Sequence, residues 1–182
     1  MVWNLPNSLT VLRVALIPFF VGCAYIPGRW GLILSTAFFG LAAFTDWADG
    51  YFARQHGLAT SFGRFFDPVA DKLLVISALV LLLGLQRAPL FLVMIILARE
   101  VMVMALRERM AGQGRQIHVS RGAKWKTGFQ MTAILMLLLQ NGLLDIPMQH
   151  LGLIFLYLST VLSIVSGFQY FTKAWPVIQK NN

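Results

Sequence analysis

Six long apolar segments constrain the fold of this chain more than any other feature of its sequence. They cover about residues 9–25, 30–54, 65–85, 89–110, 123–141 and 149–173. A helix that crosses a bilayer needs about 20 mostly apolar residues, and helices satisfy all their backbone hydrogen bonds internally. We therefore predict an all-α integral membrane protein with about six transmembrane helices. Asn7 or Ser8 is expected to cap the first helix.

The composition agrees with a membrane protein. The chain has 182 residues, of which 58% are hydrophobic and 12% are charged. Soluble domains carry about 25% charged residues. We expect residues 1–182 to form a single transmembrane domain with no soluble module. The single cysteine, Cys23, excludes an internal disulfide and a cysteine-based zinc site.

The distribution of Lys and Arg predicts the orientation of the chain. The connection between the first two helices carries Arg29, the 3–4 connection carries Arg87, and the 5–6 connection carries neither residue type. Because cytoplasmic loops are enriched in Lys and Arg, both termini and the 2–3 and 4–5 connections are predicted to be cytoplasmic. The chain would be a multi-pass protein of the inner (cytoplasmic) membrane. The chain has a formal charge of +8. We explain this charge by the cytoplasmic bias of Lys and Arg and by binding to anionic lipid headgroups and phosphorylated substrates, and we expect no nucleic acid partner.

Four aspartates stand at the cytoplasmic ends of the second and third helices. Asp46 and Asp49 are three residues apart, and Asp67 and Asp71 are four apart, so each pair shares one helical face. A short connection makes the two helices antiparallel neighbours, which is expected to bring the carboxylates together. Ionisable groups at this depth are costly, and divalent cations relieve the cost. Oxygen ligands alone favour Mg²⁺ or Mn²⁺ over zinc.

Glycines and an arginine accompany the aspartates. Gly50 and Gly63 leave room for a ligand close to the backbone, and Arg54 could bind phosphate. Two metal ions about 4 Å apart stabilise both oxygens of an in-line displacement. The carboxylate with the smallest role in metal binding could accept a proton from an attacking hydroxyl. The pattern thus predicts a site for a diphosphate compound. Any single aspartate could instead cap a helix or pair two helices without binding a metal ion. Asp67-Pro68 alone could instead form a turn.

The spacing Asp46-x2-Asp49-Gly50-x2-Ala53-Arg54-x8-Gly63-x3-Asp67-x3-Asp71 resembles the signature of the CDP-alcohol phosphotransferases at every fixed position. This resemblance implies a six-helix membrane enzyme, generally a homodimer, that uses magnesium or manganese. Such enzymes move a phosphatidyl or similar group from a CDP-linked donor to an alcohol and release CMP.

The resemblance also implies roles for individual residues. Asp46, Asp49 and Asp67 would hold two metal ions, with Asp46 and Asp67 bridging both. Asp71 would bind the second ion and act as the general base. The residues expected along the cytidine diphosphate part of the donor are Gly50, Ala53, Arg54, Thr60, Asn7 and Thr10.

Four further stretches bear on the acceptor alcohol. NLPNSLTVLR, LAREVMVMALR, GAKWKT and SGFQYF resemble the family members that join glycerol 3-phosphate to CDP-diacylglycerol, a membrane lipid. A dianionic acceptor needs cations beside Asp71. We therefore predict that its phosphate is held by Arg99, Arg107, Lys124 and Lys126. Arg99 could instead be neutralised by Glu100. Arg107, Lys124 and Lys126 could instead contact lipid headgroups.

Two other functions stay open on the sequence alone. One is the same reaction with another acceptor, such as serine or inositol phosphate. The other is a cation transporter that uses intramembrane carboxylates. A transporter would not need Gly50, Arg54 and Gly63. Its acidic residues would be expected near the midplane of the membrane, whereas those of this chain are predicted at the cytoplasmic face.

Overall fold

All the secondary structure in the described part of the chain is helical. The computed structural model describes residues 5–56, 61–112, 121–140 and 147–179, without the side chains of 5–6, 47–56, 61–65, 121–124, 173–174 and 176–179. The helices are α1 (Leu5–Cys23), α2 (Arg29–His56), α3 (Ser61–Gly84), α4 (Leu90–Gly112), α5 (Arg121–Leu139) and α6 (Met148–Gln179). The six predicted helical segments are therefore confirmed as helices.

The expected cap of the first helix is wrong. α1 begins at Leu5, so that Asn7 and Ser8 lie inside its first turns. Pro6 follows the first residue, and proline is tolerated there because the first N–H groups of a helix have no intrahelical partner. As a consequence Asn7 is part of a helical face, where its side chain is buried.

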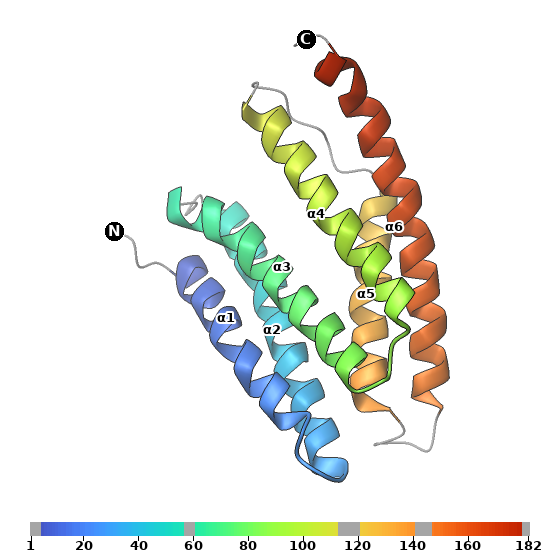
Figure 1. Cartoon of the computed structure of the whole chain (residues 1–182). Coiled ribbons are helices and arrows are strands. Elements are labelled where there is room, and N and C mark those ends of the chain that lie inside the picture. Colours follow the sequence, from blue (N-terminus) through green and yellow to red (C-terminus); the bar gives the residue numbers. More distant parts are fainter. Residues whose placement is uncertain (1–4, 57–60, 113–120, 141–146, 180–182) are drawn as a thin grey trace.

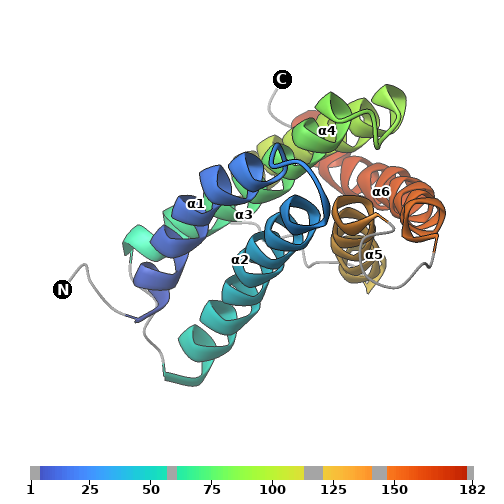
Figure 2. The same cartoon turned by 90° about the horizontal axis from the view of Figure 1, so that it is seen from below.

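The helices are arranged as two groups of three (Figures 1 and 2). α1 packs on both α2 and α3, while α5 and α4 pack on α6. α2 and α3 do contact each other, as predicted, but each packs more extensively on α1. The start of α1 and the end of α6 lie toward the same end of the bundle (Figure 1). α1 is thus placed to supply side chains to the acidic ends of α2 and α3.

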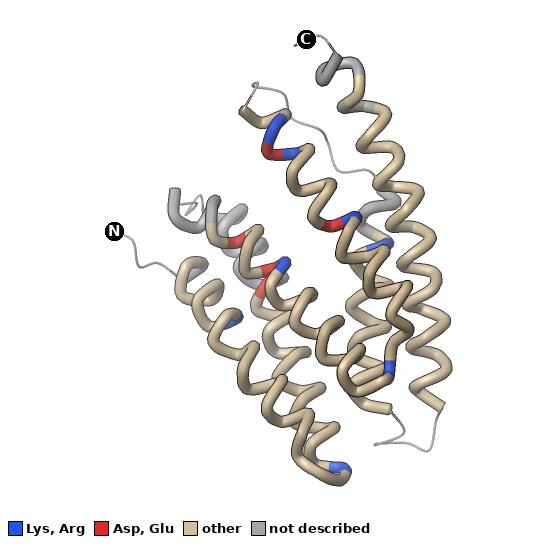
Figure 3. The backbone as a smooth tube through the Cα atoms, in the orientation of Figure 1, with Lys and Arg blue, Asp and Glu red and all other residues tan. Residues whose placement is uncertain are grey.

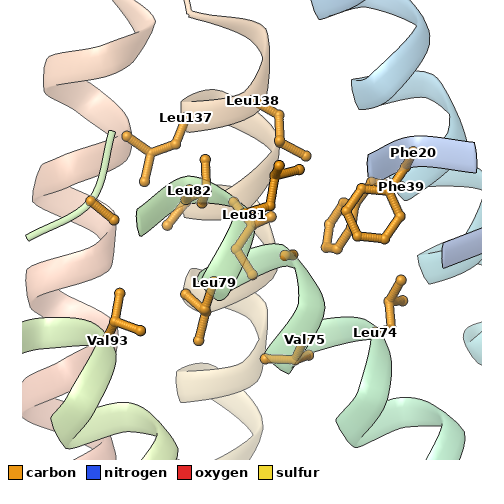
Figure 4. Packing of buried hydrophobic residues seen from close by; sticks show 14 of the residues in the cluster. Phe20, Phe39, Leu74, Val75, Leu79, Leu81, Leu82, Val93, Leu137 and Leu138 are labelled. Atoms are coloured by element: carbon orange, nitrogen blue, oxygen red, sulfur yellow. The ribbon is translucent and has the colours of Figure 1, made fainter. Parts of the chain in front are cut away.

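Large apolar side chains fill the contacts between the helices (Figure 4). Phe20 of α1 meets Phe39 of α2 edge to face, with 5.7 Å between ring centroids. Leu79 of α3 and Leu137 of α5 are fully buried in the same cluster. A Cβ at Gly152 of α6 would lie only 2.8 Å from Leu137 Cγ. Small residues are common where membrane helices pack this closely, since association there depends on close contact.

Length and hydropathy mark one described helical segment, Met148–Thr172, as able to cross a membrane, with a mean hydropathy of 2.0. Asn7–Cys23 and Trp125–Leu139 are apolar but shorter. Most of the charged residues that the structure describes gather toward the end of the bundle where α1 begins and α6 ends (Figure 3). Large apolar side chains are exposed along α4 and α6, among them Met94, Val101, Ile154, Val161 and Phe168. Exposed apolar surface of this extent suits contact with lipid.

Candidate active site

Three of the four predicted acidic residues have described side chains. Asp46 lies in α2, and Asp67 and Asp71 lie in α3. α3 begins at Ser61 and continues as a helix through Pro68. The alternative that Asp67-Pro68 forms a turn is therefore wrong, and Asp67 and Asp71 do share one helical face.

Arg13 of α1 forms an ion pair with Asp46. Its Nη1 lies 2.9 Å from Asp46 Oδ1, and the arginine side chain is fully buried while that of Asp46 is 40% exposed. This role of Arg13 was not predicted from the sequence. A cation inside an apolar run needs a partner, and that signal could have indicated it. The pair joins the middle of α1 to the acidic end of α2.

Thr10 and Asn7 lie on the same part of α1, nearer its beginning. Thr10 Oγ1 donates a hydrogen bond to Asp67 Oδ1 over 2.6 Å. Both Thr10 and Asn7 are buried. The two residues were expected along the nucleotide, which the structure does not test, and Thr10 also contacts a predicted metal ligand. A hydrogen bond to a ligating carboxylate fixes the direction of its oxygens.

Asp71 lies one turn beyond Asp67 on α3. It is close enough to Asp46, Arg13, Lys72 and Glu100 to interact electrostatically with each of them. Asp71 is therefore near two carboxylates, Asp46 and Glu100, and near two cations, its neighbour Lys72 on α3 and Arg13 of α1.

Three cations converge on Glu100, which is buried in α4 with 3% of its side chain exposed. Lys72 of α3 donates to Oε2, and Lys126 of α5 donates to Oε1. Arg99 Nη1 donates to Oε1 over 3.0 Å. We call Lys72, Arg99, Glu100 and Lys126 the Glu100 cluster. Glu100 does pair with Arg99, as the alternative for that residue anticipated, but it also binds two lysines that lie far away in the sequence.

Arg99 is held independently by α6. Its Nε donates to the Ser163 carbonyl over 3.2 Å, and its Nη2 donates to Ser166 Oγ over 2.8 Å. A Cβ at Gly167 would lie 3.1 Å from Arg99 Cγ, so the glycine lets the arginine stem pass close to α6. The guanidinium is therefore fixed by contacts other than Glu100.

Arg107 lies apart from the Glu100 cluster. It follows Arg99 by about 12 Å along α4, at the usual rise of a helix. Its Nη2 donates to the Tyr170 hydroxyl over 2.7 Å, and the guanidinium carbon lies 4.9 Å from the centroid of the Tyr170 ring. Of the predicted acceptor residues, the structure thus brings Arg99 and Lys126 together and leaves Arg107 with Tyr170.

The side chains of the remaining predicted site residues lie outside what the structure describes. The backbone of α2 and α5 includes some of them, but their side chains are not described, and the connection 57–60 is not described at all. The predictions that stay untested for this reason concern Asp49, Gly50, Ala53, Arg54, Thr60 and Lys124.

The chemistry of the donor set fits a hard divalent cation. Asp46, Asp67 and Asp71 offer only oxygen ligands, as Mg²⁺ and Mn²⁺ prefer. The described side chains by themselves do not form a group of three His, Cys, Asp or Glu residues that could hold a metal ion. Asp49, the fourth predicted ligand, is not among them. Thr10 and Arg13 hold two of the three described carboxylates from α1.

A helical membrane protein with carboxylates and a buried cationic cluster at one end of the bundle is suited to phosphate chemistry on a lipid. The sequence profile of the CDP-alcohol phosphatidyltransferase family matches residues 3–165. The chain belongs to this family, and it is an enzyme that transfers phosphatidyl groups.

Curated relatives cover nearly the whole chain. The CDP-diacylglycerol--glycerol-3-phosphate 3-phosphatidyltransferase of Bacillus subtilis (strain 168) is 37% identical over 99% of this chain and 100% of its own length. The protein of the same name from Pseudomonas fluorescens is 44% identical, covering 95% and 91%. A cardiolipin synthase (CMP-forming) from Oryza sativa subsp. japonica is 39% identical over 97% of this chain and 59% of its own length.

Proposed function

We propose that this protein transfers the phosphatidyl group of CDP-diacylglycerol to glycerol 3-phosphate, which gives phosphatidylglycerophosphate and CMP. The protein would be a phosphatidylglycerophosphate synthase and act in phospholipid synthesis. The observation that carries the proposal is the Glu100 cluster, in which Lys72 and Glu100 interact electrostatically with Asp71, and Arg99 and Lys126 are bound to Glu100. Cations beside a candidate base suit an acceptor with a phosphate group. The names of the bacterial relatives support the same reaction.

The acidic residues would hold the metal ions. Members of this family use divalent metal ions, and we assign two Mg²⁺ or Mn²⁺ ions to Asp46, Asp49, Asp67 and Asp71. When bound, such ions supply positive charge that neutralises a diphosphate. The residues assigned to the donor are Gly50, Ala53, Arg54, Thr60, Asn7 and Thr10. The hydrogen bond from Thr10 to Asp67 gives Thr10 a second role, which is to orient a metal ligand.

In the proposed reaction Asp71 is the general base. Its carboxylate accepts the proton of the primary hydroxyl of glycerol 3-phosphate, while the Glu100 cluster binds the phosphate at the other end of that molecule. The hydroxyl oxygen forms a bond to the β-phosphorus of CDP-diacylglycerol, the one that carries the lipid. The bond from this phosphorus to the bridging oxygen breaks, and CMP leaves. No covalent enzyme intermediate is required.

The membrane setting extends this proposal. We place the protein in the inner membrane as six crossings, with both termini and the active site on the cytoplasmic side. The bias of Lys and Arg along the chain supports the orientation. The exposed apolar residues of α4 and α6 support lipid contact. CDP-diacylglycerol would enter from the inner leaflet, and the enzyme would act as a homodimer.

The test is an acceptor panel with purified protein in detergent. CMP release is measured with CDP-diacylglycerol and Mg²⁺ while the acceptor is glycerol 3-phosphate, serine, inositol phosphate or phosphatidylglycerol. Release that requires glycerol 3-phosphate supports the proposal. Release with serine or with phosphatidylglycerol would keep the reaction class and reject the acceptor. Cation flux into vesicles without CMP release would instead identify a transporter.

A further inference from the structure

Glu100 has more positive charge around it than a single carboxylate can neutralise. Three cations from three helices contact it, namely Lys72 of α3, Arg99 of α4 and Lys126 of α5. Glu100 and Lys126 are nearly inaccessible, with 3% and 5% of their side chains exposed. Three positive charges less one negative charge leave the Glu100 cluster at two positive. The Lys72 side chain is 32% exposed, but those of Arg99 and Lys126 are only 11% and 5% exposed. Most of the excess charge is therefore shielded from water, which is costly unless a further anion completes it.

We propose that Glu100 is the positioning residue of the acceptor site. It gathers the two lysines and Arg99 at one point, and it sets the charge of the site to match a phosphate monoester dianion. A phosphate monoester carries about −1.5 to −2 at pH 7, which balances the two positive charges of the cluster. This inference rests on the proposed function, and it adds Lys72 and Glu100 to the residues that serve the acceptor.

The three cations depend on Glu100 to different extents. Arg99 has two other hydrogen bonds, both to α6. Lys72 and Lys126 donate to Glu100 through long, flexible side chains. Without the carboxylate, like charges would repel each other, and the lysines would turn away from Arg99. The phosphate site would then lose its shape even though all its cations were still present.

Two buried polar atoms, on residues that neighbour the cluster along α5 and α6, also favour a polar ligand. Gln130 Nε2 and Ser163 Oγ have no hydrogen-bond partner in the described part of the chain. Gln130 lies one turn beyond Lys126 on α5, and the carbonyl of Ser163 accepts the hydrogen bond from Arg99. A buried polar group without a partner is destabilising. Unused hydrogen-bonding capacity beside a net positive cluster is what a site for a phosphorylated molecule would offer.

The direct test compares Glu100→Gln with the wild type in two measurements. They are equilibrium binding of glycerol 3-phosphate, by calorimetry on detergent-solubilised protein, and the KM values for acceptor and donor. We expect the Kd and the KM for glycerol 3-phosphate to rise by about tenfold or more. A tenfold rise in Kd corresponds to a loss of about 1.4 kcal/mol of binding free energy. The KM for CDP-diacylglycerol should change by less than about twofold. Glu108→Gln is the matched control, because it removes the same charge from an exposed position on the same helix.

A double variant separates positioning by charge from a merely structural contact. Lys72→Gln combined with Glu100→Gln removes one positive and one negative charge, so that the cluster returns to two positive. Acceptor binding should recover by about threefold or more relative to Glu100→Gln alone. If Glu100 were only a packing residue, the second substitution would weaken binding further. Should Glu100→Gln fail to fold, Glu100→Asp replaces it, with a raised acceptor KM and an unchanged donor KM as the expected result.

Three results would overturn the inference alone. These are a wild-type acceptor Kd in Glu100→Gln, equal increases of the donor and acceptor KM, and additive losses in the double variant. These results bear on the inference only if the wild-type enzyme is shown to use glycerol 3-phosphate. A wild-type enzyme that releases no CMP with this acceptor would overturn the proposed function, and the inference would fall with it.

Discussion

Thr10 of α1 donates a hydrogen bond to Asp67 of α3, with 2.6 Å between Oγ1 and Oδ1. The hydroxyl is fully buried, and it ties the first helix of the chain to a carboxylate that we assign to metal binding. The same helix holds Asp46 through Arg13. α1 therefore supports the acidic site from within the bundle, although it contributes none of the predicted metal ligands.

Thr10→Val should weaken the metal site. The substitution keeps the shape of the side chain and removes the hydroxyl that orients Asp67. Loss of such a supporting hydrogen bond typically costs about 10–100-fold in metal affinity or activity. We expect the Mg²⁺ concentration for half-maximal CMP release to rise by about tenfold, while Thr10→Ser stays close to wild type. An unchanged Mg²⁺ requirement with a raised donor KM would instead assign Thr10 to the nucleotide alone.

Arg13→Gln should destabilise the protein. Removing one partner of a fully buried ion pair costs about 3–5 kcal/mol. We expect a smaller loss here, about 1–3 kcal/mol, because the side chain of Asp46 is 40% exposed. Thermal unfolding in detergent measures the effect. In a double-mutant cycle with Asp46→Asn, the two losses should not add. Additive losses would show that the pair contributes nothing to stability.

Asp71→Asn should abolish the chemical step. A general base contributes about 10²–10⁴-fold to the rate, and asparagine cannot accept the proton. Turnover should fall by about that factor, while equilibrium binding of CDP-diacylglycerol in the presence of Mg²⁺ remains within a few-fold of wild type. Glu108→Gln, at an exposed position on α4, is the charge control. Turnover near the wild-type rate in Asp71→Asn would exclude Asp71 as the base.

Arg99→Ala should raise the KM for glycerol 3-phosphate more than the KM for CDP-diacylglycerol. A hydrogen bond to a charged group contributes about 1.5–3 kcal/mol, so an increase of about tenfold or more is expected for the acceptor. Lys126→Ala should act in the same direction. Arg109→Ala, in the exposed last turn of the same helix, should leave both values unchanged. Equal increases in both KM values would remove Arg99 from the acceptor site.

Gly152→Ala should loosen the contact between α5 and α6. The added Cβ would lie 2.8 Å from Leu137 Cγ, and insertion of this kind into a packed core costs about 1–3 kcal/mol. Gly128→Ala is the control, since nothing lies within 4 Å of its Cβ position, and alanine there favours the helix. Unfolding temperatures should fall for the first variant and stay level or rise for the second. Equal unfolding temperatures would contradict the packing described here.

The positions of the helices could be predicted because apolar runs and helix boundaries are local features. The fifth segment, predicted at 123–141, is observed at Arg121–Leu139. The start of α1 could not be placed as well, since Asn7 is a favourable cap by type while Pro6 allows the helix to begin earlier. The spacing of Asp67 and Asp71 likewise indicated a shared face, which α3 provides.

The partners of the charged residues could not be predicted, because they depend on how the helices pack. Lys72 and Lys126 meet Glu100 across three helices, and no sequence spacing relates them. The contacts of Arg13 with Asp46 and of Thr10 with Asp67 were not predicted for the same reason. The sequence did offer one unused signal, which is that Arg13 stands in an apolar run and requires an anionic partner.

The most direct measurement follows the acceptor into the product. Purified wild-type protein is given CDP-diacylglycerol, Mg²⁺ and ³²P-labelled glycerol 3-phosphate, and both CMP and label in the lipid extract are quantified. The account predicts one labelled lipid molecule for each CMP released, with neither formed in the presence of EDTA. Release of CMP without label in the lipid would contradict the assignment of glycerol 3-phosphate as the acceptor.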